Sequence, residues 1–250
     1  MVSLLAFATT ALATVFFEHL LVRWTQRRQT HTGAWATALA LFALASAAFA
    51  IGASTGWDAG TFRAFYLFGA VLNVPWLAFG TVALLAPRAA PRVRTGLLLF
   101  SGLAVGVVLA APMRGSIAAQ GIPEGREVFD AFPRILAAVG SGVGALVVLV
   151  GAVWSAWRYL SGQDANRRRV GSNLLIALAV IILSGGGIVE GLAGGEDEAF
   201  ALSLAVGTAV LYLGFRFATG SDVQVSSRRS NFPANPRGNA STKSTVEGAL

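Results

Sequence analysis

The sequence contains no cysteine, one lysine and two histidines among its 250 residues. Without cysteine the chain can form no disulfide, thiolate metal site, iron–sulfur cluster or cysteine nucleophile. The lysine is Lys243, close to the C-terminus, so no apolar segment carries the lysine that a retinal Schiff base requires. The His-Glu-x-x-His motif, the P-loop and the dinucleotide fingerprint are missing as well. We therefore expect a protein that is not an enzyme and that holds no cofactor or metal.

Charge is also scarce. Only 12% of the residues are charged and 55% are hydrophobic, whereas a soluble domain usually carries about a quarter charged residues. The apolar residues form blocks of roughly 18–25 residues, the length that an α-helix needs to cross a hydrocarbon core of about 30 Å. The blocks show no alternation of apolar and polar residues, which favours helices over a β-barrel. The sequence predicts an all-α integral membrane protein.

The apolar blocks predict a seven-helix bundle in one domain over residues 1–219. The expected spans are about 3–22, 34–55, 64–86, 95–113, 134–157, 170–191 and 199–217. The remainder, 220–250, is rich in Ser, Asn and Pro and has hardly any large apolar side chain. Such a composition predicts a disordered tail.

The arginines indicate how the helices lie across the membrane. With the N-terminus outside, the outer segments hold Arg63, Arg114, Arg126 and Arg134, and all other basic residues fall inside. Because inner loops of membrane proteins are enriched in Lys and Arg, we expect an outer N-terminus and a cytoplasmic C-terminus. The net charge of +7 then follows from topology, and we expect the lipid bilayer rather than nucleic acid as partner. A protein partner at the Arg-rich inner loops and tail, and a homo-oligomer, both stay open.

The first span carries Thr10, Thr14 and Glu18 at a spacing of four, which places them on one helical face. Glu18 lies five residues before Arg23, about 7–8 Å along the helix axis. One interpretation is a carboxylate that relays protons or binds a cation. The favoured one is a structural carboxylate that pairs with an arginine or a neighbouring donor. The adjacent His19 is the only histidine in a span, so a haem site has little support.

The third span holds the most distinctive string, FYLFGAVLNVPWLAFGT over 65–81. Tyr66, Asn73 and Gly80 recur every seven residues. Pro75 is expected to free the carbonyl of Val71 four residues earlier. One hypothesis is that Asn73 binds a ligand or marks a hinge. The other is structural: its amide caps the freed carbonyl or forms a hydrogen bond between two helices.

The other spans carry small and polar residues that favour helix packing. The stripes are Gly102-x-x-x-Gly106-x-x-x-Ala110, Gly140-x-x-x-Gly144 and Gly151-x-x-x-Ser155. Asn173 in the sixth span and Tyr212 in the seventh add polar groups. The candidate ligand or proton residues are Glu18, Asn73, Tyr66, Thr14, Asn173 and Tyr212.

The string of the third span and the strong preference for Arg over Lys resemble uncharacterised multi-pass membrane proteins of high-GC bacteria. The resemblance implies a bacterial plasma membrane but no activity. We favour a non-catalytic sensor, scaffold or partner subunit. A transporter or channel for a small solute or proton, using Glu18 and Asn73, is an alternative, and a cofactor-binding electron-transfer subunit using His19 is another. A polar cavity joining Glu18 to Asn73 would favour transport, and a dry, packed interior would favour the first hypothesis.

Overall fold

The computed structural model describes residues 1–114, 121–160, 171–172, 174–183, 185 and 197–230. Helices dominate this described part of the chain and no strand occurs in it, which confirms the all-α prediction. The chain divides into two units, Met1–Ala218 and Thr219–Leu250. The first unit holds the long apolar helices.

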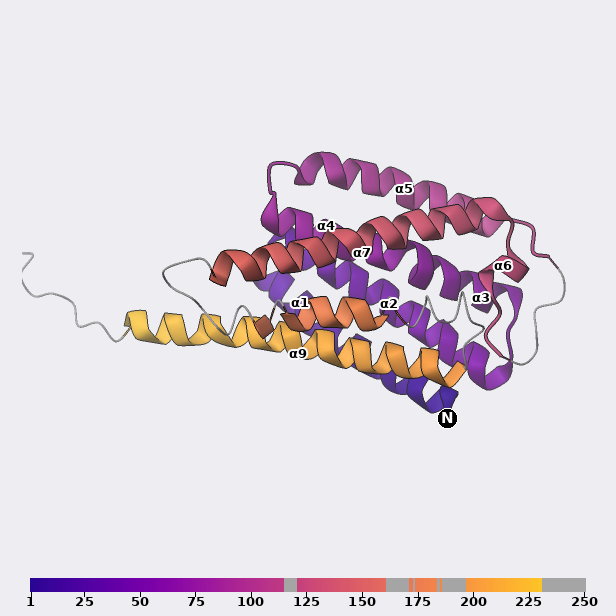
Figure 1. Ribbon diagram of the computed structural model, residues 1–250, viewed down its shortest axis with the longest axis horizontal. Coiled ribbons are helices and arrows are strands. Elements are labelled where there is room, and N and C mark those ends of the chain that lie inside the picture. Colours follow the sequence, from indigo (N-terminus) through magenta and orange to yellow (C-terminus); the bar gives the residue numbers. More distant parts are fainter. Residues whose placement is uncertain (115–120, 161–170, 173, 184, 186–196, 231–250) are drawn as a thin grey trace, which may run out of the picture. The chain divides into compact units, whose positions relative to one another are not determined.

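The elements are coloured by sequence in Figure 1. They are α1 (Val2–Arg27), α2 (Thr30–Thr55), α3 (Ala59–Phe65), the π-helix η1 (Tyr66–Leu72), α4 (Asn73–Leu85), α5 (Ala90–Ala110), α6 (Gly125–Val128), α7 (Ala131–Leu160) and α9 (Asp197–Ser230). Within the first unit α1 packs along α2, and the continuous helix of α3, η1 and α4 packs between α2 and α7.

Six helices of the described chain are long and apolar enough to cross a bilayer, which supports a membrane-embedded multi-pass protein. They are Val2–Arg27, Thr30–Thr55, Ala59–Leu85, Ala90–Ala110, Ala131–Arg158 and Asp197–Phe217. A shorter apolar helix, Leu174–Leu183, falls within the expected span 170–191, much of which lies outside the described residues. The count of seven and the orientation therefore stay predictions.

Several helix boundaries differ from the expected ones: α1 ends at Arg27 rather than 22, α3 begins at Ala59 rather than 64, and α5 begins at Ala90 rather than 95. The helix expected over 95–113 ends at Ala110, because Ala111 is extended with ψ 130° and precedes Pro112, which disfavours the helical conformation before it. α9 continues to Ser230 rather than ending near 217, so it covers the start of the expected tail. Disorder over 220–250 stays a prediction.

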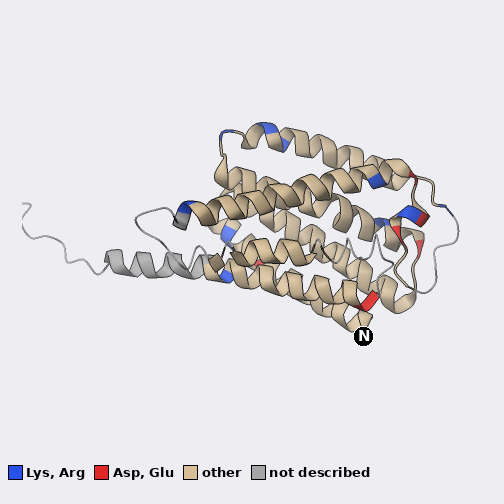
Figure 2. Cartoon of the chain, in the orientation of Figure 1, with Lys and Arg blue, Asp and Glu red and all other residues tan. Residues whose placement is uncertain are grey.

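The two ends of the first unit differ in charge (Figure 2). We call the arginine end the one where α1, α4 and α7 finish and α2 and α5 begin. It holds the arginines at the end of α1, at the start of α5 and at the end of α7. The opposite end, the α6 end, carries α6, the start of α3 and both charge signs.

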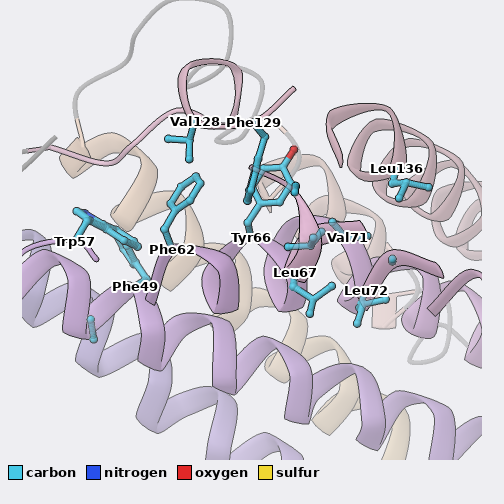
Figure 3. Packing of buried hydrophobic residues seen from close by; sticks show 14 of the residues in the cluster. Phe49, Trp57, Phe62, Tyr66, Leu67, Val71, Leu72, Val128, Phe129 and Leu136 are labelled. Carbon is cyan, nitrogen blue, oxygen red and sulfur yellow. The ribbon is translucent and has the colours of Figure 1, made fainter. Parts of the chain in front are cut away.

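The largest buried cluster lies at the α6 end (Figure 3). Phe49, Phe62 and Phe129 have no exposed surface, and Trp57 and Tyr66 are 9% exposed. The rings of Tyr66 and Phe129 are 5.0 Å apart, and those of Phe62 and Phe129 are 5.6 Å apart. Aromatic pairs at such distances add to the stabilisation from burial. This cluster ties α2, α3 and η1 to the segment that follows α6.

Four large aromatic rings of the described chain rest directly on glycines, where a methyl group would overlap the ring. The pairs are Trp24 on Gly33, Trp35 on Gly80, Trp57 on Gly52 and Tyr66 on Gly125. In the second pair the indole Nε1 of Trp35 also donates to the carbonyl of Leu77, 3.2 Å away. The missing Cβ of each glycine thus sets how closely two segments approach.

Candidate functional site

Of the predicted site residues, Thr14 and Glu18 lie on the outward face of α1, where both are exposed. The hydroxyl of Thr14 donates to the carbonyl of Thr10 at 2.8 Å, within its own helix. The carboxylate of Glu18 makes no hydrogen bond or ion pair with any residue that the structure describes. Ala8 and Ala11 are exposed on the same side, one to three turns earlier. An unpartnered carboxylate therefore lies on the outward face of α1, which is otherwise apolar and also carries the exposed side chains of Phe7 and Val15.

Tyr212 of α9 takes part in a seam of aromatic and cationic groups near the arginine end. Its ring lies 5.3 Å from that of Phe16 and 5.9 Å from that of His19, both on α1. The guanidinium of Arg216 lies 6.0 Å from the Tyr212 ring centre. Such contacts pack α1 against α9.

The imidazole of His19 has one nitrogen engaged, because Nδ1 lies 2.8 Å from the carbonyl of Val15. The second histidine, His31, packs its ring against Trp35 at 5.3 Å. The two imidazoles therefore contact different residues. No group of three or more metal-binding side chains occurs among the described residues.

Pro75 acts on the third span through the π-helix η1. The N–H of Asn73 donates to the carbonyl of Phe68, five residues earlier. The π-helix ends at Leu72 and α4 begins at Asn73, so Pro75, which has no N–H to donate, lies in the first turn of α4. The loss of a donor for the carbonyl of Val71 stays a prediction.

The carbonyl of Ala70 in η1, five residues before Pro75, accepts a hydrogen bond from Ser141 of α7, with 2.6 Å between the two oxygens. The backbone of α7 reaches this point because of the glycine stripe. A Cβ on Gly140 would lie 2.9 Å from the Val71 oxygen, and one on Gly144 would lie 3.0 Å from the Val74 carbonyl carbon. Ser141 was missed as the capping residue, although its place in Gly140-Ser141-Gly142 was the available signal.

Asn73 is half-buried, and its side-chain amide makes no hydrogen bond with any part of the chain that the structure describes. Asn73 therefore caps no carbonyl of the described chain, and the side-chain donor to the third span beside it is Ser141. The amide stays an unpartnered polar group within an apolar span.

Tyr66, Asn73 and Gly80 do not form one continuous face. Tyr66 packs against Gly125 and Phe129, whereas Gly80 packs against Trp35 of α2. The π-turn between Tyr66 and Leu72 holds one more residue per hydrogen-bonded ring than an α-turn. This extra residue shifts the phase, so a spacing of seven in sequence does not give a stripe in space.

The segment after α5 folds over the α6 end. Arg63 donates from Nη2 to the carbonyl of Ala111 at 2.7 Å. Arg114 forms an ion pair with Asp130, and its N–H donates to the carbonyl of Val128 at 2.9 Å. These contacts hold Val128 and Phe129 over the aromatic cluster.

A partly open cavity of about 90 Å³ lies nearer the arginine end, among α1, α2, α4, α7, α9 and the short helix Leu174–Leu183. Its lining is almost wholly apolar, with Thr81 and Ser155 as the hydroxyl-bearing exceptions. Neither Glu18 nor Asn73 lines it. A second hollow, of about 380 Å³, is a groove between α4 and α7.

The small-residue stripes play different parts. Gly140, Gly144 and Gly151 pack closely against the third span. Gly102 and Gly106 of α5 have no atom within 4 Å of the position that a Cβ would take. The expected packing role of this α5 stripe within the bundle is therefore wrong for the described chain, because α5 turns the stripe outward.

Asn173 lies outside the described residues. Its neighbour Ser172 is buried and donates to the carbonyl of Gly214 at 2.7 Å. Comparison with models of protein families, with curated proteins and with solved structures finds no match for this chain. What the molecule does must therefore be argued from the geometry above.

Proposed function

We propose that this chain is a non-catalytic partner subunit of a membrane complex and that it binds a transmembrane helix of a second protein through the outward face of α1. The observation that carries the proposal is the exposed, unpartnered carboxylate of Glu18 within an apolar helix. An ionisable group at membrane depth is expensive unless another group pairs with it. A partner helix with a basic or hydrogen-bond-donating side chain at that depth supplies the missing contact.

The surface around Glu18 fits such a helix. Ala8, Ala11 and Thr14 lie on the outward side of α1 together with the larger exposed side chains of Leu4, Phe7 and Val15, which gives a partner helix an apolar surface next to Glu18. The Thr14 hydroxyl is satisfied within α1, which leaves Glu18 as the group that selects the partner. Arg23 lies on the same helix toward the arginine end, but it engages other groups.

The interior of the first unit supports this proposal over transport. The cavity near the arginine end is apolar and is lined by neither Glu18 nor Asn73. The α6 end is filled by fully buried phenylalanines. A solute or proton needs polar groups or water along its path, and the described residues offer no such series between these two side chains.

The test is site-specific photocrosslinking in intact membranes, with the photoreactive residue placed at Thr14. We expect one crosslinked species that contains a different protein, that persists in Glu18→Gln and that is lost in Glu18→Leu. The matched control places the photoreactive residue at Leu103, which is 51% exposed on α5, and is expected not to give this species.

Glu18 is exposed, so both substitutions leave the packing intact, which size-exclusion chromatography of the purified variants checks. A crosslinked species that survives Glu18→Leu would overturn the proposal. So would a species made of two copies of this chain, since the partner would then be the chain itself.

A further inference from the structure

We infer that the groove between α4 and α7 binds an anionic phospholipid, with one acyl chain along the groove and the phosphate near Arg88 and Arg158. The inference does not depend on the proposed partner at α1, because the groove and the α1 face share no residue.

The walls of the groove are apolar over their whole length. Thr81, Val82, Leu85 and Ala86 line it from α4, and Leu146, Val147, Val150, Gly151 and Trp154 line it from α7. No charged residue lines it. Leu146, Val150 and Trp154 are 61%, 64% and 55% exposed. In a helix that crosses a bilayer, such a surface is in contact with hydrocarbon.

The same stripe of α7 ends in a cation. Leu146, Val150, Trp154 and Arg158 follow one another at a spacing of four, so they share one face of the helix. On the α4 side, Arg88 follows Ala86 by two residues. Both arginines are exposed, and neither makes a hydrogen bond or ion pair with the residues that the structure describes. Two free guanidinium groups thus stand at the arginine end of an apolar groove.

This order of groups matches a phospholipid. Guanidinium groups bind phosphate with paired hydrogen bonds. Indole rings prefer the level of the headgroups, and Trp154 and Trp157 stand here with ring centres 5.6 Å apart. Below that level a hydrocarbon chain meets the apolar walls. A protein helix fits less well, because helix contacts in membranes favour small residues, and the exposed wall consists of Leu, Val and Trp.

The groove also adjoins the partly open 90 Å³ cavity. Both spaces are lined by Thr81, Leu85 and Gly151. A Cβ on Gly151 would lie 2.5 Å from Cγ2 of Thr81 and 3.1 Å from Cδ1 of Leu85. The groove and the cavity are therefore separated at this point by the side chains of Thr81 and Leu85 and not by the backbone of α4. An apolar cavity stays dry and takes up apolar groups. The end of the bound acyl chain is the group that this cavity accepts.

The experiment is native mass spectrometry of the purified full-length protein with added phosphatidylglycerol or phosphatidylcholine. We expect phosphatidylglycerol to bind more tightly. Removing both groove arginines, in Arg88→Gln with Arg158→Gln, is expected to weaken phosphatidylglycerol binding roughly 10- to 30-fold, given the attraction of each arginine to anionic lipid. The control pair, Arg27→Gln with Arg28→Gln at the end of α1, removes the same charge but is expected to leave the affinity within about twofold.

A second pair of variants tests the acyl chain. Val150→Trp fills the groove and is expected to lower the binding of both lipids. Val153→Trp, on the same helix but outside the groove lining, is expected to leave both unchanged. Equal loss in the two arginine pairs would mean general surface attraction and would overturn the inference. Unchanged binding in Val150→Trp, or a crosslink from position 150 to another polypeptide instead of lipid, would overturn it as well.

Discussion

Ser141 on α7 donates its hydroxyl to the carbonyl of Ala70 at 2.6 Å, at the point where Pro75 removes a backbone donor from the third span. The bond joins α7 to the π-helix η1 about one turn before the proline. Pro75, the π-helix η1 and the glycine-lined approach of α7 lie together at this point of the third span.

Ser141→Ala is expected to lower the free energy of unfolding by about 1 kcal/mol, the size of a hydrogen bond between membrane helices. The measurement is unfolding of the purified protein in detergent or lipid. Ser101→Ala is the matched control, because Ser101 donates within its own helix to Leu97 and its loss is expected to cost little. In a Pro75→Ala background, residue 75 regains an N–H, so Ser141→Ala is expected to cost less. Equal costs in the two backgrounds would contradict this coupling.

Gly80→Ala is expected to destabilise the protein by about 1–3 kcal/mol, because the new methyl group overlaps the indole of Trp35. The hydrogen bond from Trp35 to Leu77 is expected to be lost with it. Gly102→Ala serves as control, since nothing surrounds that site and alanine is a better helix former. Thermal unfolding of both variants checks this. A Gly80→Ala protein as stable as Gly102→Ala would contradict the close contact.

Asn73→Leu is expected to keep or raise the stability, because the amide has no hydrogen-bond partner in the described chain and pays a cost of burial. The unfolding free energy of the variant in the same detergent is the measurement. Asn73→Asp, which places a charge at the same site, is expected to destabilise strongly. A clear loss of stability in Asn73→Leu would contradict this prediction, because it would mean that the Asn73 amide makes a stabilising hydrogen bond.

Asp58 starts α3 by accepting hydrogen bonds from the N–H groups of Gly60 and Thr61, at 2.7 and 3.1 Å. The Thr61 hydroxyl and these N–H groups lower the pKa of the Asp58 carboxyl below its ordinary value. A lowered pKa means stability that is present above the unfolded-state pKa and is lost as the pH falls through the folded-state value.

We therefore expect the wild type to lose this contribution below a pH of about 4, where aspartate ordinarily titrates. Asp58→Asn keeps a capping oxygen and is expected to lack this part of the pH dependence, and Asp58→Ala is expected to be less stable at neutral pH. Unfolding midpoints at neutral and acidic pH measure both effects. Identical pH profiles for wild type and Asp58→Asn would rule the cap out as the source.

The long helices could be predicted from sequence because one property, an apolar run of bilayer length, determines them. Their ends could not be placed as well, since polar residues such as Gln26 and Arg27 continue α1 past its apolar part. The C-terminal end of α5 could have been predicted from the sequence, because Pro112 disfavours the helical conformation at the residue before it.

The candidate site was harder to predict, because it depends on the exact helical periodicity of the third span and on which side of each helix is buried. The π-turn in η1 breaks the seven-residue relation between Tyr66 and Asn73, and no residue type announces such a turn. The stripes of α5 and α7 look alike in sequence, yet Gly144 is buried and Gly106 is exposed. Which face a helix turns inward depends on all its neighbours. Sequence patterns of one helix do not contain that information.

The rings that rest on glycines carry a consequence for how this chain can vary over time. In the pairs Trp35–Gly80 and Tyr66–Gly125, a large ring fills the space that a side chain at the glycine would occupy. A change at either residue alone leaves an empty space or a steric overlap, so we expect substitutions at the two sites to be coupled. In related sequences we expect a smaller side chain in place of the aromatic residue to occur together with a larger residue in place of the glycine.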